Sequence, residues 1–158
     1  MARLEWSDSL VLDLPVMDET HQEFVALLAG VEAADDAALR PAWQILIAHT
    51  EEHFGREDAW MRATGFAANN CHSTQHAVVL QVMREGLQMD GAQGLAHVRE
   101  LARQLAPWFV QHAQTMDAAL ALHLRSVGFD AVSGSLLLSC TLPHEPIHGC
   151  GSAACAPA

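Results

Sequence analysis

The chain has 158 residues, enough for one domain with a substantial apolar core, and its 51% hydrophobic and 17% charged composition is typical of a folded protein. Its formal net charge of −11 argues against nucleic acid and against an anionic membrane surface as partners, because both attract basic proteins. There is no recognisable signal peptide and no apolar run of membrane-spanning length, so we expect a cytoplasmic protein.

Helical periodicity dominates the chain from the first apolar stripe onward. The predicted helices cover residues 18–32, 39–64, 71–88 and 93–125. Residues 4–17 are predicted to be irregular, Asp18 is the expected N-cap of the first helix, and Asn70 that of the third. Pro107 should kink the fourth helix, because proline lacks the backbone N–H and crowds the preceding turn. No segment shows the alternation expected of a strand.

Helices of this length with short connections favour an all-α fold, an antiparallel up-down four-helix bundle. The composition changes near residue 126, after which Gly, Ser, Ala, Pro and Cys dominate and charges are few. We therefore predict one domain over residues 1–125, with an irregular N-terminal arm, and a flexible tail over residues 126–158.

Histidine is the unusual feature of the composition, with 10 copies, and several lie on the apolar faces of the predicted helices. His53 and Glu57 are four residues apart in the same sector as Leu46 and Phe54, and the third helix repeats this spacing with two histidines. The inward-facing polar set comprises His21, His53, Glu57, His72, His76, His112 and Asp117. A metal-free structural bundle would leave these groups buried without partners, which is costly.

Five imidazoles and two carboxylates exceed the capacity of one metal ion but suit two. The mixture of nitrogen and oxygen ligands favours Fe, Mn or Zn. If both carboxylates bridge two ions and a bridging oxygen completes the set, one ion keeps an open position, and such a position next to a redox-active pair suits O2. His112 and Asp117 are five residues apart, about 140° on a regular helix, so we predict a π-type turn or another local distortion there.

These residues resemble the hemerythrin family, and within it the single-domain bacterial members. The resemblance covers roughly residues 4–125 and rests on Trp6, on the segments 17–22, 53–58, 72–76 and 108–112, and on Met61, Gly65 and Asp117. It implies a non-haem di-iron centre with an oxo or hydroxo bridge, in which O2 binds reversibly as hydroperoxide. By position, His72, His76 and His112 would hold one iron, His21 and His53 the other, and Glu57 and Asp117 would bridge them.

The expected function is therefore reversible O2 binding for transport, storage or buffering, and not enzymatic turnover. The alternatives are a sensor or redox enzyme responding to O2, NO or peroxide, which needs an electron donor that the sequence does not reveal, and an iron-handling protein. A ferritin-like site is disfavoured, because the only Glu-x-x-His sequence runs from Glu145 to His148 and contains Pro146.

The remaining histidines and the cysteines have lesser predicted roles. His49 is expected on the flank of the core face, His97 and His123 on the surface, Asp18 as an acceptor that orients His21, and Cys71 as a small half-buried residue. The tail carries Cys140, His144, His148, Cys150 and Cys155, which we interpret as incidental, with a soft-metal or redox segment as the alternative.

Overall fold

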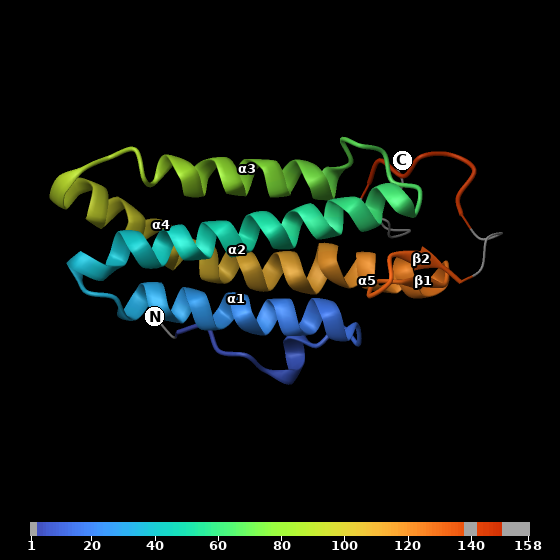
Figure 1. The fold of residues 1–158 in the computed structure, drawn as a ribbon, viewed down its shortest axis with the longest axis horizontal. Coiled ribbons are helices and arrows are strands. Elements are labelled where there is room, and N and C mark those ends of the chain that lie inside the picture. The colour runs from blue at the N-terminus through green and yellow to red at the C-terminus, as the bar shows by residue number, and fades with distance from the viewer. Residues whose placement is uncertain (1–2, 138–141, 150–158) are drawn as a thin grey trace.

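The computed structural model describes residues 3–137 and 142–149. Its long helices lie side by side, and each runs opposite to the one before it (Figure 1). The helices are α1 (Pro15–Ala33), α2 (Asp36–Ala63), α3 (Cys71–Glu85), α4 (Gly91–His112) and α5 (Ala118–Ser126), with a π-helical segment η2 (Ala113–Asp117) between the last two. The predicted antiparallel four-helix bundle is confirmed, with α4, η2 and α5 together forming the fourth member. Within the described residues, no helix is both long and apolar enough to cross a membrane.

The first helix starts earlier than predicted. It begins at Pro15, whose fixed φ angle and missing N–H suit the first helical position. Asp18 is therefore not the N-cap; its Oδ1 atom accepts a hydrogen bond of 2.8 Å from the Leu12 backbone N–H, which ties the irregular arm to the helix. A 3-10 turn, η1 (Asp8–Leu10), interrupts this arm, which runs alongside α1 (Figure 1).

The caps of the next helices decide where their side chains face. Asp35 caps α2 by accepting from the Ala38 N–H at 2.9 Å, so α2 starts three residues before the predicted position. Asn70 caps α3 as predicted, because its Oδ1 atom accepts from the N–H groups of His72 at 2.9 Å and Ser73 at 3.0 Å. The cap fixes the first turn of α3, and with it the inward direction of His72.

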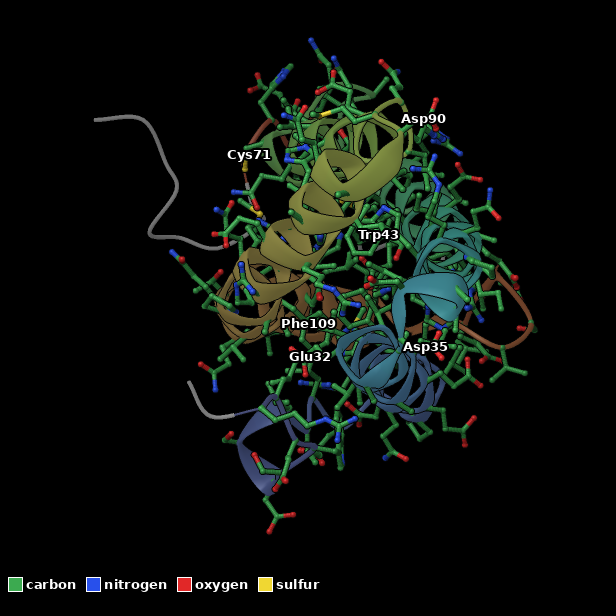
Figure 2. The ribbon with its side chains drawn as sticks, turned by 90° about the vertical axis from the view of Figure 1, so that its left-hand side faces the viewer. Glu32, Asp35, Trp43, Cys71, Asp90 and Phe109 are labelled. Atoms are coloured by element: carbon green, nitrogen blue, oxygen red, sulfur yellow. The ribbon has the colours of Figure 1, made fainter. Side chains whose placement is uncertain are left out.

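The apolar core consists of two clusters at opposite ends of the bundle. The larger includes Trp43 and Phe109, which point into the interior in the end-on view of Figure 2. The indole N–H of Trp43 donates to the Met83 carbonyl at 2.9 Å, so its burial leaves no polar atom unpaired. The smaller cluster gathers around Met61 and Leu120 near the other end. The polar residues predicted to face inward lie between the two clusters along the helices.

Part of the predicted tail packs against the smaller cluster. Two short strands, β1 (Phe129–Asp130) and β2 (Ser135–Leu136), form an antiparallel hairpin after α5, although no strand was predicted. Residues 142–149, here called the C-terminal strap, lie along the loop between α2 and α3, where Ile147 pairs with Phe66. The Ala67 N–H donates to the Ile147 carbonyl at 2.8 Å, and the Cys71 N–H donates to the His148 carbonyl at 2.9 Å.

Gly65 has no side chain and so leaves room for the strap, and its replacement should weaken the fold. Its φ of 100° is in the left-handed region, and a Cβ atom there would lie 2.5 Å from Pro143 Cγ. We expect Gly65→Ala to lower the free energy of unfolding by about 2–4 kcal/mol, from left-handed strain together with displacement of the strap. Urea denaturation measures this. Gly91→Ala is the matched control, since Gly91 has φ 66° with no neighbouring atom within 4 Å of an added Cβ. Equal losses in both variants would show that the strap contact contributes nothing.

Candidate metal centre

The second helix contributes a histidine and a carboxylate to the middle of the bundle. His53 and Glu57 lie one turn apart on the core face of α2 and are 3% and 1% exposed. His53 Nε2 lies 2.8 Å from Glu57 Oε1 and donates to it. A carboxylate this deeply buried is unfavourable unless positive charge or hydrogen-bond donors surround it, so the surroundings of Glu57 define the site.

Three imidazoles from α3 and α4 converge opposite that pair. His112 Nε2 lies 3.1 Å from His72 Nε2 and 3.2 Å from His76 Nε2, and all three rings are buried. Three ring nitrogens that face one another cannot all be satisfied by hydrogen bonds among themselves, because a neutral imidazole has one donor and one acceptor. Adjacent ligands of a six-coordinate ion lie about 3 Å apart when the metal–nitrogen distance is about 2.1 Å. The three nitrogens therefore have the spacing of ligands to one ion.

The π-helical segment brings Asp117 to the same point. A π turn contains one more residue than an α turn, so residues five apart face the same side. His112 Nε2 and Asp117 Oδ1 are accordingly 3.1 Å apart, and Asp117 is fully buried. The predicted distortion between these two residues is thus present as a π-helix over Ala113–Asp117.

The first helix closes the site with His21. His21 Nε2 lies 3.1 Å from Asp117 Oδ2 and 4.0 Å from Glu57 Oε1. Although these atoms are close, they lack hydrogen-bond alignment, and His21 Nε2, Glu57 Oε2 and both oxygens of Asp117 are buried atoms with no hydrogen-bond partner in the described structure. Such orphaned atoms are rare in folded proteins and indicate that the cluster fits a further ligand.

The seven predicted residues, here called the centre residues, form two overlapping groups with the spacing of metal sites. One group has Glu57, His72, His76, His112 and Asp117, and the other has His21, His53, Glu57 and Asp117. Within each group the potential ligand atoms lie within 4.8 Å of one another. Glu57 and Asp117 belong to both groups, as bridging ligands between two ions would.

The centre balances its charges internally. Burial raises the pKa of Glu57 and of Asp117, but the surrounding histidines outweigh burial and hold both pKa values well below the usual range. Burial lowers the pKa of His72, while the adjacent carboxylates of Asp117 and Glu57 outweigh burial and raise this pKa to about 10. The pKa of His21 is raised in the same way. Without a metal ion, protons therefore supply the positive charge that the carboxylates require.

Two residues outside the predicted set contact the outer nitrogens of the imidazoles. His76 Nδ1 donates to Asp58 Oδ1 at 2.8 Å, and His112 Nδ1 donates to Gln75 Oε1 at 3.1 Å. The helical wheel of α2 places Asp58 on its solvent face, and the structure corrects this, since the carboxylate is 26% exposed and turned toward His76. Their positions next to Glu57 and His76 in the sequence are the only signal that could have identified them.

The remaining histidines of the described residues are not part of the two ligand groups. His49 is on the flank, as predicted, and donates from Nε2 to Glu23 at 3.1 Å. His123 was predicted on the surface, but it is half-buried and donates to the Thr64 carbonyl at 2.9 Å, which joins α5 to the end of α2. His144 and His148 are exposed, whereas Cys140, Cys150 and Cys155 lie outside the described residues.

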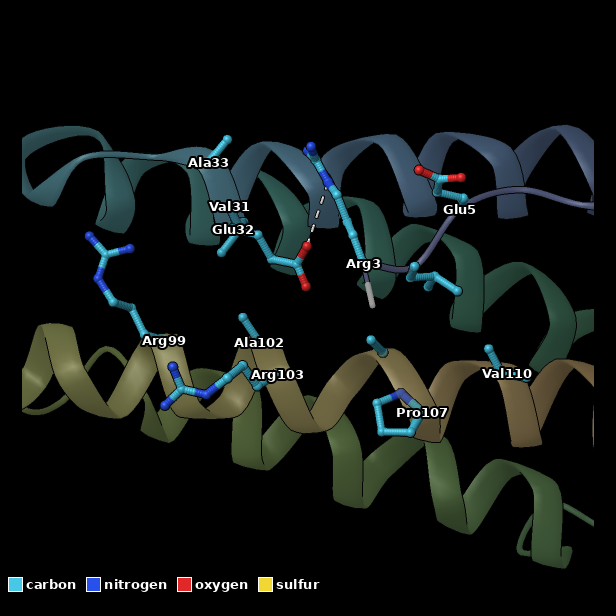
Figure 3. A pocket seen from close by; sticks show the side chains of 12 residues that line it. Arg3, Glu5, Val31, Glu32, Ala33, Arg99, Ala102, Arg103, Pro107 and Val110 are labelled. Carbon is cyan, nitrogen blue, oxygen red and sulfur yellow. Dashed lines mark ion pairs between the residues drawn. The ribbon is translucent and has the colours of Figure 1, made fainter. Parts of the chain in front are cut away.

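One surface depression among the described residues reaches His76 of the centre. It is a groove of about 660 Å³ between α2 and α3, and it contains His76 and Asp58. The larger depression, of about 720 Å³, lies between the C-terminal end of α1 and α4, where Arg3 and Glu32 form an ion pair of 3.6 Å (Figure 3). None of the centre residues lines it.

Comparison with known proteins assigns this region of the chain to a protein family. Residues 12–122 match the family model described as the hemerythrin HHE cation binding domain. The chain is 37% identical to a bacteriohemerythrin of Ralstonia nicotianae over 131 residues, which is 83% of this chain and 96% of that protein. It is 25% identical to a bacteriohemerythrin of Stenotrophomonas maltophilia over 146 residues, 87% of this chain and 94% of the relative. No solved structure matches the chain. The matched region contains all seven centre residues.

Proposed function

Because the chain belongs to the hemerythrin family, we propose that it binds O2 reversibly at a non-haem di-iron centre and serves to carry, store or buffer O2. The observation that supports this most directly is the pair of overlapping ligand groups that share two carboxylates. We assign this function to residues 1–125, with residues 126–158 as an extension.

The centre residues divide between two irons by position. His72, His76 and His112 would hold one iron, His21 and His53 the other, and Glu57 and Asp117 would bridge both. With the two bridging carboxylates counted for each, one iron has five protein ligands and the other four, which leaves a position for O2 beside His21 and His53. When bound, the irons and their bridging oxygen supply the reversible redox chemistry that holds O2.

The chain's own contribution beyond the ligands is to keep water away from that position. Phe109 stands edge-on to the His21 ring, with centroids 5.2 Å apart, and Phe24 stacks on Phe109 at 4.4 Å. Both phenylalanines are buried. Aromatic side chains on this side provide no proton or nucleophile, so they favour reversible binding over irreversible oxidation. This supports the carrier function over a redox enzyme.

Anaerobic loading with Fe(II) tests the proposal. We expect about two irons per chain and a visible band that appears with O2 and disappears when O2 is removed. His76→Ala should abolish the band because it removes a ligand. His97→Ala is the control and should leave the band unchanged, because His97 is a half-buried residue of α4 that precedes His112 by fifteen residues. Irreversible oxidation on the first exposure would favour a redox enzyme or sensor, and a chain that takes up no iron would contradict the di-iron centre.

A further inference from the structure

The imidazoles on the two sides of the centre differ in how their outer nitrogens are held. In the three-histidine group, His76 Nδ1 donates to Asp58 and His112 Nδ1 donates to Gln75, whereas the buried Nδ1 of His72 has no hydrogen-bond partner among the described residues. In the two-histidine group, the buried Nδ1 atoms of His21 and His53 have no hydrogen-bond partner among the residues that the structure describes. In a neutral imidazole, an acceptor at Nδ1 holds the ring's one proton there, which leaves the lone pair of Nε2 facing the centre.

The aromatic contacts of the imidazole rings also differ between the two groups. Phe54 stacks on His76 with a centroid distance of 3.9 Å and an interplanar angle of 8°, and Trp108 stacks on His112 at 4.6 Å and 23°. The His21 ring instead meets the edge of Phe109 at 88°. Stacking combined with an Nδ1 acceptor fixes both the tilt of a ring and its tautomer, whereas an edge contact alone leaves the tautomer open.

We propose that the centre fills in a fixed order: the first ion binds at His72, His76 and His112, the second at His21 and His53, and the ions leave in the reverse order. Asp58 and Gln75 are the positioning residues that create this order. The inference rests on the proposed function only in requiring that the centre holds two ions. Glu57 and Asp117 belong to both ligand groups, so the two positions differ only in their histidines.

Asp58 is the more decisive of the two positioning residues. Its carboxylate carries a full negative charge on the Nδ1 side of His76, which makes the imidazole a stronger donor to a cation. It also lies in the groove between α2 and α3, partly open to solvent, so its replacement does not disturb the apolar core. Loss of such an outer partner weakens metal binding by about 10- to 100-fold.

The test titrates the metal-free full-length chain with Co²⁺, following native mass spectra and the visible cobalt bands. We expect a one-cobalt species at one equivalent and a two-cobalt species beyond it, and a chelator should remove the second ion first. His21→Ala should keep the first step and lose the second, whereas His112→Ala should lose the first step. These two variants identify which position fills first, independently of any O2 reaction.

The positioning role is tested at the first binding step. Asp58→Ala should weaken that step by about 10- to 100-fold, and Asp58→Asn by less, because the amide oxygen still accepts from Nδ1. Glu52→Ala removes an exposed carboxylate from the same helix and should leave the step unchanged. Circular dichroism checks that each metal-free variant is folded. If Asp58 had only a structural role, the first binding step would not depend on whether residue 58 offers an oxygen that accepts from His76 Nδ1.

Two outcomes would overturn the inference while leaving the di-iron proposal intact. One is uptake of two cobalt ions with no one-cobalt species at any ratio. The other is an unchanged first step in both Asp58 variants. A chain that takes up no cobalt or a single ion would contradict the two-metal centre itself, and this inference with it.

Discussion

An Asp117→Ala variant is expected to bind no metal pair and to be less stable even without metal. Asp117 lies 3.0–3.1 Å from the Nε2 atoms of His21, His72 and His112, so it links α1, α3 and α4. Its removal takes away a carboxylate that belongs to both ligand groups. We expect the metal content to fall from two ions to none at concentrations that saturate the native protein, a loss of affinity above about 100-fold, the upper range for outer partners alone.

The stability effect of Asp117→Ala arises from the protonated histidines that it leaves behind. At neutral pH His72 carries a proton in the metal-free protein, because its pKa is raised to about 10. Without Asp117 much of the balancing negative charge is gone, and breaking a buried pair in this way lowers the free energy of unfolding by about 3–5 kcal/mol. Metal analysis and urea denaturation measure the two effects. Asp90→Ala, at a side chain 96% exposed, is the control, and retention of two ions by Asp117→Ala would contradict the bridging assignment.

Metal binding at pH 8 is expected to release protons, although ordinary histidines are already neutral at that pH. His72 has a pKa of about 10 without metal, and an imidazole must lose its proton to bind an ion. The apparent affinity should therefore rise with pH up to about 10, by about tenfold per unit for each proton displaced. Between pH 6 and 8 the apparent affinity for metal should rise by at least about a hundredfold, and acidification should release the metal.

A pH indicator in weakly buffered solution detects this directly. Adding Zn²⁺ to the metal-free protein at pH 8 should release at least one proton per pair of ions, and His72→Gln should release fewer. No proton release at pH 8 would show that the carboxylates do not hold protons on the imidazoles. For the metal-free fold the sign is opposite: the contribution of His72 to stability is complete below its unfolded pKa and is lost as the pH rises through about 10.

The helical spacing of the sequence was enough to predict the centre residues as a group. A histidine four residues from a second ligand faces the same side of a helix, and Leu46 and Phe54 mark which side is buried. The exception to this four-residue spacing is the pair His112 and Asp117. Their five-residue spacing predicted a local distortion, which is a π-helix in the structure. Local periodicity carries this information because all of these contacts depend on the direction of a side chain from one helix.

Features that depend on contacts between distant segments could not be predicted in this way. The pairing of Phe66 with Ile147 joins residues 81 positions apart, and neither flanking segment has a strand pattern. The hairpin strands have two residues each, too few for alternation to appear. Asp58 looks like a solvent-face residue on α2 alone, and only the position of α3 shows that it reaches His76.

The division of the apolar core into two clusters affects how cooperatively the molecule unfolds. One cluster lies on one side of the polar centre and the second on the other, so few apolar contacts connect the two ends of the bundle. Cooperative unfolding requires contacts that transmit loosening from one region to the next, and here those contacts are carried by the centre residues. Metal ions at the centre would act as cross-links between the helices that contribute the centre residues. The two ends of the loaded protein should then exchange their amide hydrogens as one unit, and those of the metal-free protein as two.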